Sequence, residues 1–299
     1  MEFDRIFIQP LTSKYDCLLF DLDDTLYPLS SGLAKACLKN IGDYMVERLG
    51  IDESKIGTLS NLLYKNYGTT MAGLRAIGYR IDYDEYHSFV HGRLPYENLK
   101  PDPVLRSLLL SLPFRKIIFT NADKVHAVKV LQKLGLEDCF EGIICFETLN
   151  PIQKIVSSDC EDEIEFLGNS SAVSHTTANN GIFDIIGHFA KATNGTEGLP
   201  KTPVVCKPLE DAIELALKIA NINPQRTIFF EDSVRNIQAG KRLGLQTVLV
   251  GTSNKPKGAD FALESIHNLR EAIPELWESE MKSEVIYHGN VPVEASVTA

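Results

Sequence analysis

The sequence has no apolar run that approaches the roughly 18–20 residues needed to cross a bilayer, which argues against a membrane-spanning protein. It also has no excess of basic residues: 30 lysines and arginines stand against 40 aspartates and glutamates, for a formal charge of −10. Proteins that bind nucleic-acid polymers usually neutralise phosphates with clustered cations. We therefore expect neither a nucleic acid nor a membrane as a partner.

Signals of export and of disulfide or zinc chemistry are missing as well. Residues 1–16 carry three acidic residues and fit neither a secretory signal nor an acid-poor transit peptide, so we expect a cytoplasmic or nuclear protein. The six cysteines form no CxxC pair, and several lie within apolar stretches. That pattern favours buried thiols in a reducing compartment.

Short apolar runs alternate with segments of helical period along most of the chain. Alternation of this kind predicts an α/β fold, in which helices cover both faces of a parallel sheet and ligands bind at the carboxyl ends of the strands. We predict strands at 17–20, 117–119, 142–146, 228–230 and 247–250, and amphipathic helices at 126–134, 209–220 and 237–243.

Two segments interrupt this alternation. Residues 28–100 contain helical patterns and no convincing strand, which predicts a small all-helical cap between two parts of the core, 1–27 and 101–280. Residues 151–203 are rich in Ser, Thr, Asn and Gly, and a loop of this length far exceeds the usual ~12–15 residues, so we expect a largely disordered insertion. Its apolar island at 182–189 could dock on the core. The tail, 281–299, is expected to be loose.

Three carboxylates, Asp21, Asp23 and Asp24, directly follow the first predicted strand. Carboxylates crowded at the end of a buried strand are costly to desolvate unless a cation or a shared proton relieves them. A divalent metal is therefore expected here. The alternative is an ordinary turn or helix start, where aspartate is a common N-cap.

Polar side chains also follow two other predicted strands. Thr120 and Asn121 end the run at 117–119, Glu231 and Asp232 end the run at 228–230, and Lys207 lies just before the helix at 209–220. In a parallel sheet these strand ends meet at one edge. Oxygen ligands with few histidines favour Mg²⁺ over zinc. Taken singly, each residue could instead be a helix cap or a solvated charge.

Four short motifs carry this pattern: FDLDDTL at 20–26, IIFTNA at 117–122, CKP at 206–208 and FFEDSVRN at 229–236. With them the sequence resembles the haloacid dehalogenase (HAD) superfamily over residues 15–277, apart from the insertion. DLDDTLYP with a small helical cap and EDSVRNI looks like the pyrimidine 5′-nucleotidase branch, and the insertion with its FDIIGHF island looks similar to plant-type members. The resemblance implies a Rossmann-like core and an aspartyl-phosphate intermediate.

Carried onto this sequence, the resemblance implies that Asp21 is the nucleophile. Asp23 would protonate the leaving oxygen and later deprotonate the attacking water. Its presence indicates phosphate-ester chemistry, because dehalogenating members lack an acid at this position. Thr120 and Asn121 would bind phosphoryl oxygens, and Lys207 would offset the negative charge of nucleophile and phosphate. The insertion puts the placement of Lys207 in doubt more than that of any other motif.

The resemblance also implies a metal site. Asp21, Asp232 and the backbone carbonyl of Asp23 would hold Mg²⁺, with water completing the octahedron. Glu231 is a further ligand candidate, and Asp24 is expected to be structural or capping.

The cap should choose the leaving group of the substrate. Tyr27, which directly follows the first motif, and Arg75 are candidate specificity residues, although aromatic residues at helical spacing usually belong to a core. Weaker candidates in the cap are Tyr67, Tyr79, Arg80, Tyr86, His91 and Arg93.

The leading hypothesis is a Mg²⁺-dependent phosphatase of small phosphomonoesters, such as the pyrimidine nucleotides UMP and CMP. A sugar-phosphate phosphatase or phosphomutase would use the same motif residues, since the cap surface sets specificity. A third hypothesis, from a different class, is a protein-binding module that recruits a partner through residues 151–203.

Overall fold

The computed structural model describes residues 14–151, 181–191 and 195–277. Most of the insertion predicted to be disordered, at 152–180 and 192–194, and the predicted loose tail at 281–299 lie outside the described residues.

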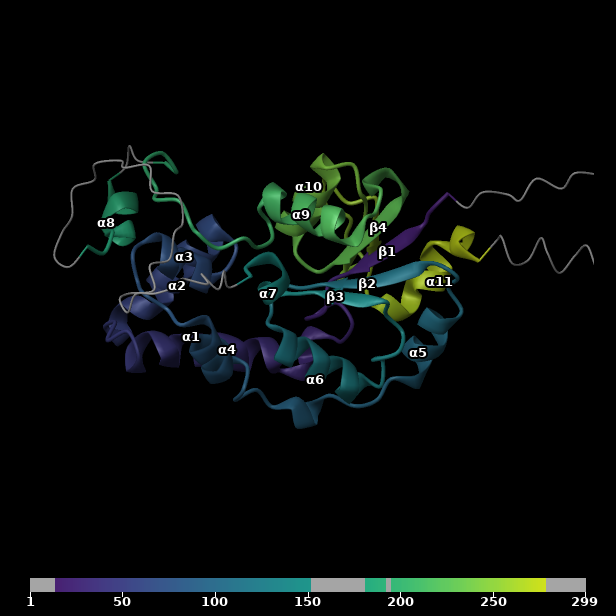
Figure 1. Ribbon diagram of the computed structural model, residues 1–299, viewed down its shortest axis with the longest axis horizontal. Coiled ribbons are helices and arrows are strands. Elements are labelled where there is room, and N and C mark those ends of the chain that lie inside the picture. The colour runs from purple at the N-terminus through teal and green to yellow at the C-terminus, as the bar shows by residue number, and fades with distance from the viewer. Residues whose placement is uncertain (1–13, 152–180, 192–194, 278–299) are drawn as a thin grey trace, which may run out of the picture.

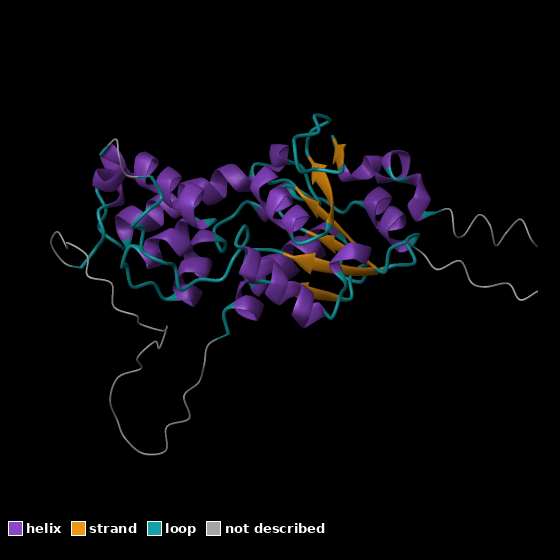
Figure 2. Cartoon of the chain, turned by 90° about the horizontal axis from the view of Figure 1, so that it is seen from above, coloured by secondary structure: helices purple, strands orange, loops and turns teal. Residues whose placement is uncertain are grey.

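The core is a six-stranded, all-parallel sheet with the order β3-β2-β1-β4-β5-β6, which confirms the predicted α/β fold (Figures 1 and 2). The first strand of the chain lies at the centre, between β2 and β4. Its four apolar residues are buried there on both faces of the sheet. The strands are β1 (Cys17–Phe20), β2 (Arg115–Phe119), β3 (Gly142–Ile144), β4 (Thr227–Glu231), β5 (Gln246–Val250) and β6 (Phe261–Leu263).

Alternate side chains of each strand feed two apolar clusters, one on each face of the sheet. On one face, Leu18 and Phe20 pack with residues of α5 (Pro103–Leu110), α6 (Lys124–Leu134) and α11 (Leu269–Ala272). On the other face, Leu19 and Phe119 pack with α9 (Glu210–Ala220) and α10 (Val234–Arg242). Figure 1 shows α9 and α10 on the opposite side of the sheet from α5 and α6. After β3 the chain turns into the short α7 (Phe146–Leu149), so the strand predicted at 142–146 ends two residues early.

Residues 28–100 form four α-helices at one end of the sheet (Figure 1). They have an apolar cluster of their own, which includes Tyr44, Leu63 and Tyr86. Asp52 and Asp82 cap two of the helices by accepting hydrogen bonds from backbone N–H groups, which explains where those helices begin. The helices are α1 (Leu33–Glu47), α2 (Glu53–Tyr67), α3 (Thr70–Ala76) and α4 (Tyr83–Val90).

The apolar island in the insertion docks on these cap helices. Ile185, the first residue of α8 (Ile185–Ala190), is 1% exposed within the cap cluster, and Figure 1 shows α8 beside α2 and α3. Phe183 N–H donates to the Ile77 carbonyl at 2.8 Å. The sequence suggested that this island could dock on the core, but it docks on the cap: its apolar residues pack against helices that lie far away in the sequence. A protein partner for the segment stays a prediction.

Among the described residues, no helix is both long enough and apolar enough to span a membrane.

Candidate active site

The carboxyl ends of β1, β2 and β4 face a cavity of about 770 Å³ between the sheet and the cap. Asp21 follows β1, Thr120 follows β2, and Glu231 is the last residue of β4; all three line this cavity. Parallel pairing of β1 with both neighbours brings the three chain segments to one edge, as the sequence predicts.

Lys207 reaches the centre of this group despite the insertion that precedes it. Its Nζ donates to Asp21 Oδ1 at 2.7 Å, to Glu231 Oε2 at 2.8 Å and to the Phe119 carbonyl at 2.7 Å. The side chain is 1% exposed. Burial by itself would lower the pKa of Lys207, but the charges of Asp21 and Glu231 outweigh burial and raise it. Lys207 is therefore a permanently charged ammonium held against two carboxylates.

The Asn121 side chain explains how Lys207 is held. Its Oδ1 accepts from the Lys207 backbone N–H at 2.9 Å, and its Nδ2 donates to the Lys207 carbonyl at 3.0 Å. Thr120 Oγ1 accepts from the Ala122 N–H at 3.0 Å, and its own O–H donates to no group among the described residues. Both Thr120 and Asn121 line the cavity, and their predicted contacts with phosphoryl oxygens stay predictions.

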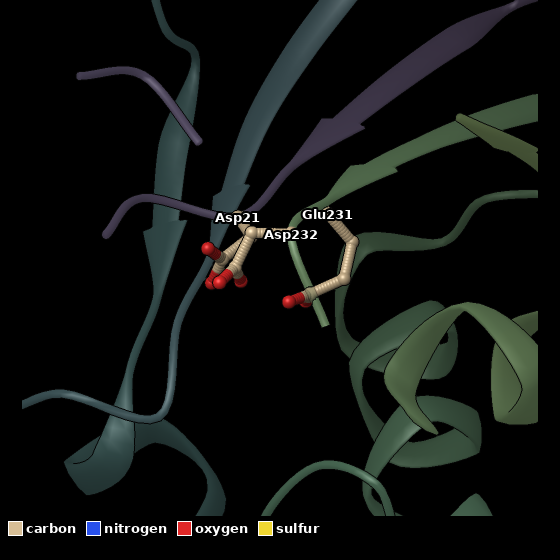
Figure 3. A group of neighbouring side chains, drawn as sticks. All are labelled: Asp21, Glu231 and Asp232. Carbon is tan, nitrogen blue, oxygen red and sulfur yellow. The ribbon is translucent and has the colours of Figure 1, made fainter. Parts of the chain in front are cut away.

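Three carboxyl groups gather closely enough to hold a cation. Asp21, Glu231 and Asp232 each offer an oxygen, and these oxygens all lie within 4.8 Å of one another (Figure 3). Burial raises the pKa of Asp21 to about 7, helped by the charge of Glu231. Burial likewise raises the pKa of Asp232 to about 6 and that of Glu231 to about 7.

Asp24 adds a further unbalanced carboxyl to the same cavity. It sits in the left-handed backbone region at φ 57°, and its buried Oδ1 has no hydrogen-bond partner. Burial, together with the charges of Asp23 and Asp21, raises its pKa to about 6. One ammonium, Lys207, therefore faces several crowded carboxyls. An all-oxygen group with this surplus of negative charge fits a hard divalent cation such as Mg²⁺.

The side chain of Asp23 is held away from this carboxylate group. Its Oδ1 accepts from the Tyr27 hydroxyl at 2.5 Å and from His126 Nε2 at 2.7 Å. Burial by itself would raise the pKa of Asp23, but the charge and hydrogen bond of His126 and the hydrogen bond of Tyr27 lower it to about 2. Any metal ligand from Asp23 would thus be its backbone carbonyl. Tyr27 lines the cavity, but its hydroxyl is committed to Asp23.

Sequence reasoning missed His126 and its surroundings. His126 Nδ1 lies 2.8 Å from the Tyr96 hydroxyl, and the His126 backbone N–H donates to Asp123 Oδ2 at 3.1 Å. Burial would lower the pKa of His126, yet the charge of Asp23 raises it. A signal existed: His126 occupies the buried stripe of its helix with Ala127, where a polar residue is uncommon.

Arg75, a predicted specificity residue, does not line the cavity. Its Nη1 donates to the Tyr79 carbonyl at 3.0 Å, and its guanidinium lies 5.8 Å from the Tyr83 ring centroid. Arg75 therefore contacts neighbouring parts of its own cap. Of the weaker candidates, Tyr86 and His91 do line the cavity.

Comparisons with known proteins agree with the motifs. Residues 167–244 match the family model of the haloacid dehalogenase-like hydrolases. Phosphate metabolism protein 8 of Saccharomyces cerevisiae is 32% identical over 143 residues, which cover 45% of this chain and 44% of that protein. The chain thus spans less than half the length of this curated relative.

Two solved structures have a partly similar arrangement. A HAD-hydrolase, YfnB from Bacillus subtilis bound to magnesium, is 17% identical with a TM-score of 0.46, covering 87% of this chain and 98% of its own. A HAD phosphatase from Thermococcus onnurineus is 16% identical with a TM-score of 0.46, covering 86% and 96%.

Proposed function

We propose that this HAD-like hydrolase is a Mg²⁺-dependent phosphomonoesterase that acts through an aspartyl-phosphate at Asp21, on pyrimidine nucleoside 5′-monophosphates such as UMP and CMP. The observation that carries the proposal is the contact of Lys207 Nζ with Asp21 Oδ1 at 2.7 Å, at the edge of the sheet where three carboxyls meet. A nucleophilic carboxylate beside a buried ammonium is suited to receive a negatively charged phosphoryl group.

In the first step, a carboxylate oxygen of Asp21 attacks phosphorus, and the bond from phosphorus to the ester oxygen breaks. Thr25 Oγ1 donates to Asp21 Oδ2 at 2.9 Å, so Thr25 and Lys207 together fix the plane of the carboxylate before attack. The leaving oxygen takes a proton from Asp23, whose pKa is low before substrate binds and would rise as the negatively charged phosphoryl group comes to lie beside it. Oδ2 of Asp23 is the oxygen available for this transfer, because Oδ1 already accepts from Tyr27 and His126.

In the second step, Asp23 accepts a proton from water as the water attacks phosphorus, and the bond between phosphorus and Asp21 breaks. Free phosphate leaves and both carboxyls return to their starting state. Asp21, Asp232 and Glu231 are the side chains that would hold Mg²⁺, with the Asp23 carbonyl as a fourth candidate ligand. When bound, the ion would neutralise charge on the phosphoryl oxygens and orient them for in-line attack.

The lining of the cavity supports a nucleoside as the leaving group. Tyr86 and Phe146 supply aromatic surface, and Asn61 on α2 supplies an amide that can both donate to and accept from the edge of a base. A cavity of about 770 Å³ is within the usual range for small-molecule sites.

A phosphomutase is disfavoured by the same lining. A bisphosphate primer needs a second cationic site, and each of the two lysine or arginine side chains in the described lining already has partners within the protein. Lys207 binds Asp21 and Glu231, and Arg235 Nη1 donates to the Tyr64 carbonyl at 2.8 Å.

The test is phosphate release from a panel of esters with Mg²⁺ and with EDTA: UMP, CMP, purine monophosphates, hexose phosphates and p-nitrophenyl phosphate. We expect Mg²⁺-dependent release with a preference for UMP and CMP. A preference for hexose phosphates would change the proposed substrate and leave the proposed chemistry intact. No release from any ester with Mg²⁺ present would overturn the proposed activity and favour the protein-binding hypothesis.

A further inference from the structure

One histidine of the cap is oriented by a carboxylate of the core. His91 follows the last residue of α4, and its Nδ1 donates to Asp123 Oδ1. Asp123 is itself immobilised, because its Oδ2 accepts from the His126 backbone N–H at 3.1 Å and so caps α6. A carboxylate with both oxygens engaged fixes the direction of the His91 ring across the boundary between cap and core.

Neighbouring rings fix the plane of His91 as well. The His87 ring lies nearly parallel to it, with centroids 5.5 Å apart and planes 12° apart. The His126 ring centroid lies 4.6 Å from that of His91. His126 in turn contacts Asp23 through its Nε2 at 2.7 Å. His91 is therefore one ring removed from the side chain that would protonate the leaving group.

The second ring nitrogen of His91 faces a different environment. His91 lines the cavity and its side chain is 15% exposed. Among the described residues, no hydrogen bond to His91 Nε2 is found. Nε2 is also not one of their buried polar atoms that lack a partner, so it is accessible from the cavity. Nε2 of His91 is therefore oriented and accessible, and it has no hydrogen-bonding task among the described residues.

We propose that His91 Nε2 binds a hydroxyl of the leaving group, a role that rests on the proposed phosphomonoesterase function. An ionised carboxylate can only accept, so the Nδ1 proton of His91 points at Asp123. Nε2 then hydrogen-bonds a hydroxyl such as those of ribose, which can both donate and accept. His91 is in this account a substrate-binding residue, and Asp123 is a positioning residue that acts through it.

The chemistry predicts selectivity among substrates. Loss of one hydrogen bond that leaves a buried partner unpaired costs about 1–3 kcal/mol, which corresponds to roughly 5- to 150-fold in kcat/KM. Only esters whose leaving group carries a hydroxyl should suffer this loss. The leaving group of p-nitrophenyl phosphate carries none.

The experiment compares wild type with His91→Ala and Asp123→Asn on two esters. One is p-nitrophenyl phosphate, and the other is whichever of UMP, CMP and the hexose phosphates wild type prefers. For both variants we expect kcat/KM to fall by about 10-fold or more on the hydroxyl-bearing ester, chiefly through KM, and by less than about 3-fold on p-nitrophenyl phosphate. Asn at position 123 can still cap α6, so that variant retains the helix start.

A matched control is His267→Ala. His267 Nε2 also donates to an aspartate, Asp102 Oδ2, at 2.7 Å, but His267 does not line the cavity. This control should leave both activities unchanged. Equal losses on both esters in His91→Ala, or no loss on either, would overturn the hydroxyl-binding role while wild-type activity upholds the proposed function. If wild type hydrolyses neither ester, the proposed function fails and the role of His91 fails with it.

Discussion

Lys207 Nζ lies 2.7 Å from Asp21 Oδ1, although the two residues are 186 positions apart in the chain and an insertion lies between them. The contact depends on two features: the central position of β1 in the sheet, and the pair of hydrogen bonds between the Asn121 amide and the Lys207 backbone. It joins the first and third motifs in one buried ion pair. The charge balance of the candidate site depends on this pair.

Lys207→Met should both destabilise the protein and abolish phosphate release. The change leaves Asp21 and Glu231 buried without their cation, and breaking a buried ion pair in this way costs about 3–5 kcal/mol. Urea unfolding with and without Mg²⁺ measures the effect. Because the unpaired carboxyls gain more from a cation, Mg²⁺ should stabilise the variant more than wild type. An unchanged unfolding free energy would show that the pair does not carry this charge balance.

Asp23→Asn should slow turnover by roughly 10²–10⁴, the usual contribution of a general acid–base residue. Asparagine can still accept from Tyr27 and His126 through its Oδ1, so the local hydrogen bonds are retained. With p-nitrophenyl phosphate, whose leaving group needs no proton, stopped-flow should detect a burst of p-nitrophenolate followed by slow phosphate release. A steady-state rate within about 3-fold of wild type would remove Asp23 from its proposed role.

Ile185→Ala should lower the unfolding free energy by about 2–5 kcal/mol, the usual cost of truncating a fully buried isoleucine. The change removes the anchor of α8 from the cap cluster. Ile219→Ala is a matched control, because Ile219 is 47% exposed on α9 and should cost little. Equal effects of the two changes in urea unfolding would show that the island does not stabilise the cap.

The stability contributed by Asp123 should disappear in acid. Burial by itself would raise the pKa of Asp123, but the hydrogen bond and charge of His91 lower it below its usual range. A carboxyl with a lowered folded-state pKa stabilises the protein above its unfolded pKa of about 3.9, and that stability is lost as the pH falls below this value. The difference in unfolding free energy between wild type and Asp123→Asn should therefore be constant near neutrality and shrink below about pH 4. A difference that stays constant down to pH 3 contradicts the assignment.

The central features of the fold and the site could be predicted from the sequence because they depend on local signals. Buried runs such as 17–20 form strands, and Asp21 and Asp232 follow strands directly, so parallel pairing alone brings them together. Strand β6 was missed because it has only three residues and two of them are partly exposed. The docking of Ile185 on the cap rather than the core, and the His126–Asp23 contact, were missed because each joins segments that only the tertiary structure brings together.

The prediction for Arg75 was drawn from residue type alone. An arginine side chain is suited to bind a phosphate, but the Arg75 guanidinium instead lies against the backbone carbonyl of Tyr79 and the ring of Tyr83 in the cap. The face of its helix that Arg75 occupies decides whether the side chain can reach the cavity, and a single sequence indicates that face only weakly here.

The most direct test of the account is acid-quench mass spectrometry during turnover of the preferred ester with Mg²⁺. The account predicts a phosphoryl group on the peptide that contains Asp21, labile in alkali and absent from Asp21→Asn, which should fold normally and release no phosphate. Phosphate release by Asp21→Asn above a few per cent of wild type, or a phosphoryl group on another residue, would contradict Asp21 as the nucleophile.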